Sequence, residues 1–317
     1  MENKKEMSEE EYLQKHIADL ESNKKVEKKN VITNPPSGLG SPDNSKIGDI
    51  NFFNFDVREL PCGKFYPQGT ILMIRPAQVK EIQAYSMVDD NNFYDVIEKM
   101  NGILRSCIRV KYPNGEIGTY LDIKDQDRIY LIFMIRELTF QKGNSLGVKM
   151  SCNDCGTENE LELVRRNFKF HEFDEKMMKY YNRSSNSFIF RTKSGDEYEI
   201  SPPNIGLQKS FTEFIIKENN DKREPNLAFL KIIPFMLNGK NTISYEEIKK
   251  KLVEFEKMED MSFQFLNATI TKMVFGIKEL VKKCDSCGLE IHTEMQFPNG
   301  ASGIFLIHDA FEAFIEE

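Results

Sequence analysis

An α+β fold is predicted by three observations on this sequence. Short strand-like runs mix with helical periodicity between residues 49 and 150, which predicts a small mixed N-terminal domain. Two C-x-x-C pairs stand far apart, and this arrangement predicts a zinc ribbon split between two distant knuckles. The residues between the pairs become mainly helical in pattern, which predicts a helical insertion. The expected regions are a flexible arm at 1–48, a mixed α/β N-terminal domain at 49–150, a split zinc-ribbon and hairpin region at 151–204 and 284–303, a helical insertion at 205–283, and a C-terminal helix at 304–317.

The composition is typical of a protein with a sizeable core and no membrane span. Of 317 residues, 40% are hydrophobic, and 24 Phe and 11 Tyr supply much of the apolar volume. The longest apolar run, residues 129–135, is far shorter than the roughly 20 residues that a membrane-spanning helix needs. The charged N-terminus has no apolar segment behind it, so we expect no signal peptide and a cytosolic origin.

Residues 1–48 differ from the rest in composition. They are rich in Lys, Glu, Asn and Ser, and residues 34–42 form a Pro/Gly/Ser-rich run that is typical of a linker. The arm offers little apolar surface to offset the entropy of ordering, so we expect it to be disordered alone. The alternative is a tail that folds on a partner.

The N-terminal domain shows alternating strand and helix signals. Turn residues at 60–67 separate two strand-like runs, and Pro113, Asn114 and Gly115 mark a hairpin. Asp125 can cap a helix whose apolar run indicates burial on most sides. The expected elements are strands at 51–58 and 70–75, helices at 77–87 and 92–106, a hairpin at 110–121, and a helix at 125–138.

The second half of the chain surrounds the two cysteine pairs. Strands are expected on both sides of the first pair and after the second, and a capping box at Ser244 and Glu247 opens one helix of the insertion. The expected elements are strands at 147–150 and 161–164, a hairpin of 188–191 with 198–200, helices from 205 to about 283, a strand at 289–297, and a closing helix at about 304–314.

The four paired cysteines predict one structural Zn²⁺ ion per chain, bound by Cys152, Cys155, Cys284 and Cys287. Zinc takes four ligands in a tetrahedron, and each C-x-x-C puts two thiolates on one tight turn. A glycine follows each pair and can take the positive φ that such a turn needs. Because 128 residues separate Cys155 from Cys284, the metal would close a long loop and pin both ends of the insertion.

Other uses of these cysteines are open but less well supported. A redox pair needs only one C-x-x-C at a helix start, disulfides are unusual in this compartment, and a catalytic zinc keeps an open coordination position. His292 lies close enough to Cys287 in sequence to replace one ligand. The remaining cysteines, Cys62 and Cys107, have no chemical partner in the sequence, and Cys107 fits a small buried residue.

No pattern in the sequence indicates catalysis. It contains no Walker loop, no G-x-G-x-x-G and no G-x-S-x-G, and its four histidines stand in unrelated contexts. We therefore expect a protein that is not an enzyme.

The order of motifs resembles the baseplate protein family of T4-like contractile-tailed phages, which includes a baseplate hub subunit and a hub-assembly factor. Leu60-Pro61-Cys62-Gly63-Lys64-Phe65-Tyr66-Pro67 is followed by Ile74-Arg75-Pro76, Glu81, Ile135-Arg136-Glu137 and the first cysteine pair. The family pattern looks like LPSKG-x-Y; here Cys62 replaces Ser, and one residue fewer precedes Gly63. The resemblance is strongest over residues 55–165.

The resemblance implies a hub-associated structural or assembly protein of a contractile phage tail baseplate, which acts through contacts with other baseplate or hub proteins. It implies assembly in the host cytoplasm, with the virion tail as a second location. Within the turn segment, Leu60, Pro61, Gly63, Phe65 and Tyr66 are candidate partner-binding residues; the alternative is a turn that fills the core.

A zinc-ribbon regulator that binds nucleic acid or RNA polymerase is the alternative function. Acidic residues match or outnumber basic ones around both cysteine pairs, and the net charge is −7. Since phosphate binding needs a basic face, we expect no nucleic acid as partner.

Overall fold

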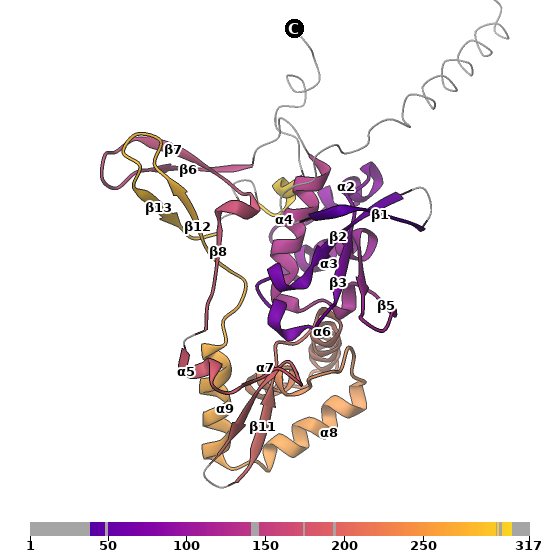
Figure 1. Cartoon of the computed structure of the whole chain (residues 1–317). Helices are drawn as coiled ribbons and strands as arrows, with labels where there is room; N and C mark the ends of the chain where they lie inside the picture. The colour runs from indigo at the N-terminus through magenta and orange to yellow at the C-terminus, as the bar shows by residue number, and fades with distance from the viewer. Residues whose placement is uncertain are drawn as a thin grey trace, which may run out of the picture. The chain divides into compact units, whose positions relative to one another are not determined.

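The computed structural model describes residues 39–47, 50–140, 146–173, 175–192, 195–295, 297 and 300–305. Within them lie four separate sheets and the helices that pack on them (Figure 1). The helices in this described part of the chain are all too short or too polar to cross a membrane.

A five-stranded antiparallel sheet forms the N-terminal domain, in the order β1-β2-β3-β4-β5. The central strands are rich in aromatic and β-branched residues, which favour a half-buried pleated surface. Phe53, Phe55, Leu72 and Ile74 are all buried at 1% exposure or less. The strands are β1 (Leu39–Ile47), β2 (Ile50–Asp56), β3 (Ile71–Ile74), β4 (Ile108–Lys111) and β5 (Ile117–Gly118).

Strand β1 corrects the predicted boundary of the N-terminal arm. The arm was expected to extend to residue 48, but residues 39–47 pair with β2 in an antiparallel ladder. Its register shifts twice, and it contains Pro42. An edge strand tolerates both features because only one of its sides pairs, so the Pro/Gly/Ser run gave a misleading linker signal. The rest of the predicted arm lies outside the described residues.

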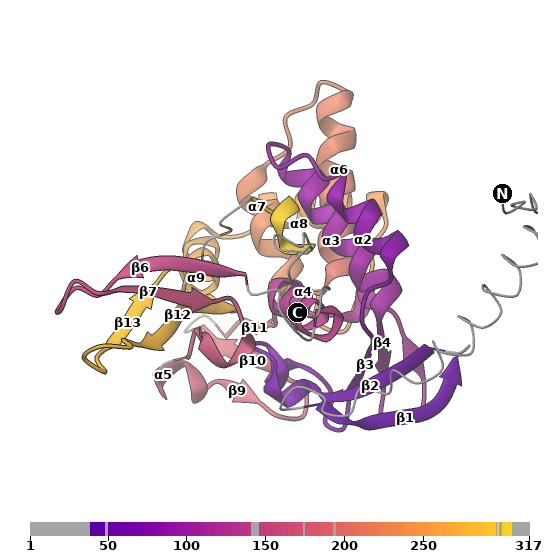
Figure 2. The same ribbon diagram turned by 90° about the horizontal axis from the view of Figure 1, so that it is seen from above.

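Three helices pack in this domain and confirm the expected helical segments. They are α2 (Val79–Ser86), α3 (Phe93–Cys107) and α4 (Arg128–Thr139). Helices α2 and α3 lie side by side in both views, and α3 also contacts α4 (Figure 2). The apolar run of α4 is buried on most sides, since Leu131 to Ile135 are fully inaccessible. This helix is therefore the centre of the core.

The second half of the chain contributes three smaller sheets. A two-stranded hairpin carries the first cysteine pair, a three-stranded sheet of order β13-β12-β8 carries the second, and another three-stranded sheet has the order β11-β10-β9. The strands are β6 (Gly147–Ser151), β7 (Glu158–Glu162), β8 (Phe168–Phe170), β9 (Tyr181–Asn182), β10 (Ser187–Arg191), β11 (Glu197–Ile200), β12 (Ile277–Lys283) and β13 (Glu290–Thr293). A short helix, α5 (Glu175–Met178), precedes β9.

The helical insertion ends earlier than expected. Its helices are α6 (Ile205–Asn220), α7 (Leu227–Ile232), α8 (Tyr245–Glu256) and α9 (Asp260–Lys272), with a 3₁₀ turn at Ile233–Met236. The predicted helix up to residue 283 is wrong at its end, where β12 pairs with β8 on one side and β13 on the other. Gly276 precedes this strand with a φ of 87°, which a helix cannot accommodate.

The described C-terminal residues return to the N-terminal domain. Ser302–Phe305 is a 3₁₀ turn, and Ile304 and Phe305 are buried at 0% and 1% exposure. The Tyr85 hydroxyl donates to the carbonyl oxygen of Ala301 at 3.0 Å, and Arg136 Nε donates to that of Ile304 at 2.6 Å. The predicted helix over 304–317 starts within this turn, and its remainder lies outside the described residues.

Candidate metal centre

The two cysteine pairs meet although they are far apart in the sequence. The turn between β6 and β7 faces the turn between β12 and β13, and the two hairpins lie side by side in both views (Figures 1 and 2). The Sγ atoms of Cys152 and Cys287 are 3.7 Å apart, and those of Cys155 and Cys284 are 3.6 Å apart. All four sulfur atoms lie within 4.8 Å of one another.

The two knuckles have the same backbone geometry. In the first, the N–H of Cys152 donates to the carbonyl of Thr157 at 2.9 Å, and the N–H of Gly156 donates back to Cys152 at 2.9 Å. In the second, the N–H of Cys284 donates to the carbonyl of Leu289 at 2.7 Å, and the N–H of Gly288 donates to the carbonyl of Cys284 at 3.0 Å. Both glycines have a positive φ, 72° and 75°, which other residues adopt at a cost. The matched motifs in the sequence therefore fold into matched turns.

Asn159 joins the two knuckles through its side-chain amide. Its Nδ2 donates to Cys284 Sγ at 3.6 Å, and its Oδ1 accepts from the N–H of Asp285 at 2.9 Å. The residue is 2% exposed on β7 and belongs to the first knuckle's hairpin. The sequence did not lead us to predict a role for Asn159. The available signal was a polar residue at a position of β7 where the side chain points into the protein.

Hydrogen bonds in the cluster favour the thiolate form of individual cysteines. Repulsion between neighbouring sulfur atoms opposes the ionisation of several cysteines at once. The backbone N–H groups of Cys287 and Ser286 lower the pKa of Cys284 to about 6. The Thr157 hydroxyl and N–H lower the pKa of Cys155. The N–H of Leu289 also lowers the pKa of Cys287, but burial and the neighbouring cysteines outweigh it and raise that pKa to about 12. Four thiolates this close repel one another strongly, so without a bound cation some of the four sulfur atoms keep their protons.

The sulfur positions fit a tetrahedral metal site. With a zinc–sulfur distance of about 2.3 Å, the edge of a regular tetrahedron is about 3.8 Å. The closest sulfur pairs, at 3.6 and 3.7 Å, match this edge. Cys152 and Cys284 are buried, whereas Cys155 and Cys287 are exposed. Donor type, number and spacing are thus all compatible with a zinc site.

His292, the alternative ligand, faces carboxylates instead. Its Nδ1 lies 3.3 Å from Glu279 and its Nε2 lies 3.5 Å from Glu290. The cluster of possible metal ligands found among the described residues contains the four cysteines and no histidine. The geometry therefore favours a site made only of sulfur.

The turn segment at 60–67, predicted as a candidate partner-binding segment, lies mostly in the interior. Leu60, Phe65 and Tyr66 are only 3–4% exposed, and Gly63 is also buried; Pro61 is partly exposed. A Cβ on Gly63 would lie 2.3 Å from the carbonyl oxygen of Val57, so only glycine fits. This burial is what a turn that fills the core would show, and partner binding by these residues stays a prediction.

One buried carboxylate organises this turn. Asp127 is fully buried; its Oδ1 accepts from the N–H of Cys62 at 2.8 Å, and its Oδ2 accepts from the hydroxyl of Tyr66 at 2.8 Å. Burial raises the pKa of Asp127 to about 7, although both hydrogen bonds act in the opposite direction. Burial also raises the pKa of the Cys62 thiol well above its usual range, so this cysteine stays protonated.

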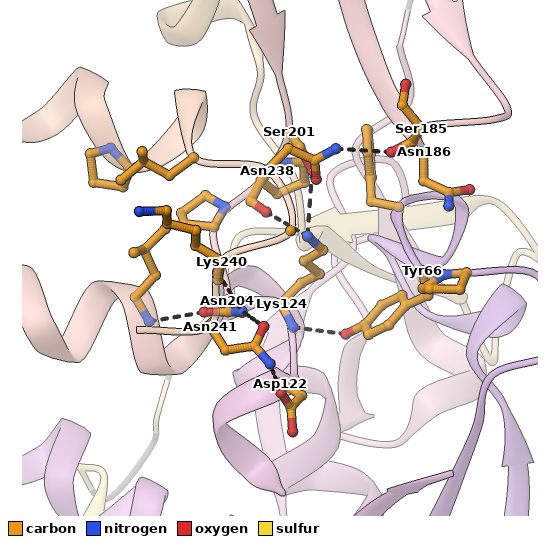
Figure 3. A pocket seen from close by; sticks show the side chains of 18 of the residues that line it. Tyr66, Asp122, Lys124, Ser185, Asn186, Ser201, Asn204, Asn238, Lys240 and Asn241 are labelled. Atoms are coloured by element: carbon orange, nitrogen blue, oxygen red, sulfur yellow. Dashed lines mark hydrogen bonds between the residues drawn. The ribbon is translucent and has the colours of Figure 1, made fainter. Parts of the chain in front are cut away.

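A polar cavity of about 270 Å³ adjoins the same turn (Figure 3). The N–H of Lys124 donates to the Tyr66 hydroxyl at 2.8 Å, while Lys124 Nζ donates to the carbonyl of Pro202 at 2.9 Å. On another wall, Asn204 Nδ2 donates to Asn241 Oδ1 at 2.7 Å. The bond from Lys124 to Pro202 links the N-terminal domain to the residues just before the insertion, and the bond from Asn204 to Asn241 links these residues to the insertion, so the cavity marks a structural junction.

Comparisons with known proteins agree with this description of a structural molecule. Neither the curated proteins nor the solved structures include a match to the chain. The sequence profile of a family described as T4 bacteriophage base plate protein matches residues 54–300, which contain the five-stranded sheet's core, the insertion and both knuckles. The chain therefore belongs to the T4 bacteriophage base plate protein family.

Proposed function

We propose that this chain is a hub-associated structural or assembly component of the contractile tail baseplate, and that one structural zinc ion holds its two halves together. Family membership over residues 54–300 is the observation that carries the proposal, since it supports a structural role in a phage baseplate. Hub association extends that role and rests on the motif order around residues 60–67.

The proposed zinc would be held by Cys152, Cys155, Cys284 and Cys287. Their four thiolates would fill the coordination shell, which suits a structural ion and leaves no open position for a substrate. Structural zinc binds with apparent free energies of roughly 10–16 kcal/mol in small peptides. Loop closure over the 128 intervening residues costs much less, because that cost grows only with the logarithm of length. The ion can therefore hold the insertion in place.

The proposed mode of action is protein–protein contact without catalysis. The closed sulfur site supports it, as do the buried polar groups near Tyr66, which are paired with one another. We place assembly in the host cytoplasm and the site of action in the baseplate of the tail.

Co-purification from phage-infected cells tests the proposal. A tagged chain should recover baseplate hub proteins, identified by mass spectrometry, and the Cys284→Ser chain should recover far less of them. Ser286→Ala is the matched control, because it changes the same exposed knuckle and keeps the backbone N–H that faces Cys284.

Mass spectrometry of purified tails distinguishes a structural component of the baseplate from an assembly factor. A stable component is present in finished particles, whereas an assembly factor is recovered only from infected cells. If the tagged chain recovers other baseplate proteins but no hub protein, the hub association is wrong and the family role stands.

A further inference from the structure

The polar cavity beside Tyr66 lies where four segments of the chain meet (Figure 3). Its lining comes from the N-terminal domain, the turn before β10, the residues just before α6 and the segment that leads into α8. Gly239 and Lys240 belong to this lining and are exposed, so a solute can reach the cavity. Its volume of about 270 Å³ is smaller than that of most drug-sized ligand sites, so it suits a small group.

Lys124 places a positive charge in this cavity without an anionic partner among the described residues. Its Nζ donates to the carbonyl oxygen of Pro202 at 2.9 Å and to Ser201 Oγ at 3.4 Å, and both acceptors are neutral. Several other shielded cations have a carboxylate partner: Arg75 pairs with Glu81, Arg128 with Asp125 and Arg165 with Glu137. Since a charge taken out of water is normally paired, the ammonium group of Lys124 calls for an anion.

The acidic groups near Lys124 are engaged elsewhere. Asp122 also lines the cavity, but its carboxylate accepts from a backbone N–H and from the side chain of Asn241. Both oxygen atoms of Asp127 accept from groups of the turn at 60–67. Burial lowers the pKa of Lys124 to about 8, so the ammonium form still predominates at neutral pH.

Two adjacent donors in the cavity have hydrogen atoms without an acceptor among the described residues. An ammonium group carries three hydrogens, of which Lys124 uses two. The Ser201 hydroxyl accepts from Lys124, and its own hydrogen is unused. Figure 3 shows the two side chains next to each other, and because Nζ and Oγ are 3.4 Å apart, one oxygen atom about 2.8 Å from each can accept from both. A water molecule can do so too, but it leaves the charge without a counterion.

The apolar part of the lining indicates which class of anion fits. It consists of four prolines and two leucines, namely Pro67, Pro202, Pro203, Pro234, Leu207 and Leu237. A carboxylate on a short aliphatic stem can present an oxygen to Lys124 and Ser201 while its stem packs on these side chains. Phosphate has no apolar stem, and its oxygen atoms need more donors than one ammonium and one hydroxyl group.

We propose that this cavity binds a carboxylate group on a short aliphatic stem, with Lys124 as its charge partner and Ser201 as its second donor. One carboxylate oxygen accepts from Lys124 Nζ and Ser201 Oγ, and the stem lies against the prolines. The group comes either from a free small acid or from an acidic residue of a protein partner. The second source rests on the proposed function, whereas the site itself does not.

Acetylation of lysines in the purified full chain tests the site at Lys124 itself. An amine-reactive acetyl ester is added in propionate or in chloride of equal ionic strength, and peptide mass spectrometry gives the labelling rate of each lysine. Propionate should slow the labelling of Lys124 and leave that of Lys250, an exposed residue of α8, unchanged. Equal rates for Lys124 in propionate and chloride, or equal slowing by phosphate and propionate, overturn the proposal.

Ser201→Ala tests the second donor. It removes one hydrogen bond to a charged group, so the propionate concentration that gives half protection of Lys124 should rise by about tenfold or more. Ser185→Ala is the matched control, because that hydroxyl belongs to the same lining and bonds to Ser187 at 2.7 Å instead of Lys124. Equal protection in Ser201→Ala and in the unaltered chain would show that the assigned contact is wrong.

Carbodiimide coupling distinguishes the two sources, because it joins an amine to a carboxylate in contact with it. In complexes purified from infected cells, a link from Lys124 to an acidic residue of a baseplate protein identifies a partner as the source. Protection by propionate without any such link identifies a free acid. If hub proteins co-purify but propionate does not protect Lys124, only this inference fails. If propionate protects Lys124 but no hub protein co-purifies, the site stands and the hub association fails.

Discussion

Two polar sites hold distant segments of this protein together, and they do so by different chemistry. The four cysteines bring together two hairpins, with 128 residues between Cys155 and Cys284, whereas Asp127 joins the turn around Cys62 and Tyr66 to the start of α4. The proposed zinc ion would supply the cysteine site with a charge that comes from outside the chain. The Asp127 site is complete by itself, since its two oxygen atoms are paired with groups of the chain. If the proposed zinc is bound, the cysteine site depends on metal supply, whereas the Asp127 site depends on burial.

The largest effect should come from breaking the metal site. Cys284→Ser removes one ligand, so the zinc content should fall from about one ion per chain to well below one half, and the free energy of unfolding should fall by about 4 kcal/mol or more. Metal analysis by plasma mass spectrometry and calorimetry check both values. Ser286→Ala should keep the zinc content and the free energy of unfolding of the unaltered chain. A full zinc content in Cys284→Ser would falsify the assignment of this ligand.

Breaking the carboxylate site should have a smaller effect. Asp127→Ala leaves the N–H of Cys62 and the hydroxyl of Tyr66 buried without an acceptor, which should cost about 2–5 kcal/mol of unfolding free energy. Urea unfolding measures this loss. Asp127→Asn keeps one acceptor oxygen and should lose less. Equal losses in the two variants would show that shape, and not hydrogen bonding, holds the turn.

The link between the two knuckles can be tested without touching a ligand. Asn159→Ala removes the bonds to Cys284 Sγ and to the N–H of Asp285. Groups that orient metal ligands typically contribute ten- to hundredfold in affinity, so competition with a chelator should show zinc affinity lowered by about that factor. Asn153→Ala, in the exposed first turn, is the control and should retain the affinity of the unaltered chain.

The two sites should respond to pH in opposite directions. Burial raises the pKa of Asp127 from 3.8 to about 7, so the folded state binds more protons than the unfolded state between these values. The stabilising contribution of this group is therefore complete below about pH 4 and is lost as pH rises through 7, at about 1 kcal/mol per pH unit. Zinc binding weakens as pH falls, because thiols must lose protons to bind.

The pH dependence of Asp127 can be isolated by subtraction. The difference in unfolding free energy between the unaltered chain and Asp127→Asn should decrease from pH 5 to pH 7.5, since the metal contribution cancels. A difference that stays constant over this interval would show that Asp127 does not titrate there.

Residues with a local sequence pattern were predictable at these two sites, and residues without one were not. The four cysteines were predicted as a set because each C-x-x-C is a local pattern and the two copies match each other. Their proximity in the structure agrees with that grouping, while the identity of the metal stays a prediction. Asn159 and Asp127 escaped notice because a single Asn or Asp has no local pattern; its role depends on partners that only the fold brings close.

Much of the fold was likewise predictable where the signal was local. The buried helix α4 and the hairpin of β10 with β11 follow from an apolar run and a turn motif. Strand β12 was predicted as helix because its residues gain strand geometry from pairing on both sides, with β8 and β13. Strand β1 was assigned to the arm for a similar reason, since its ladder with β2 is visible only in three dimensions.

The distance between the knuckles has a consequence for the order of events during synthesis. A ribosome adds about 5–20 residues per second, so the 128 residues after Cys155 take roughly 6–26 s to make. During that time the first pair can offer an ion only two ligands, and the domain at its N-terminal side can already fold. The four-sulfur centre can form only after Cys284 and Cys287 have been made. Closure thus follows the folding of the N-terminal domain, and a chain cut short before Cys284 leaves the ribosome with an open first hairpin.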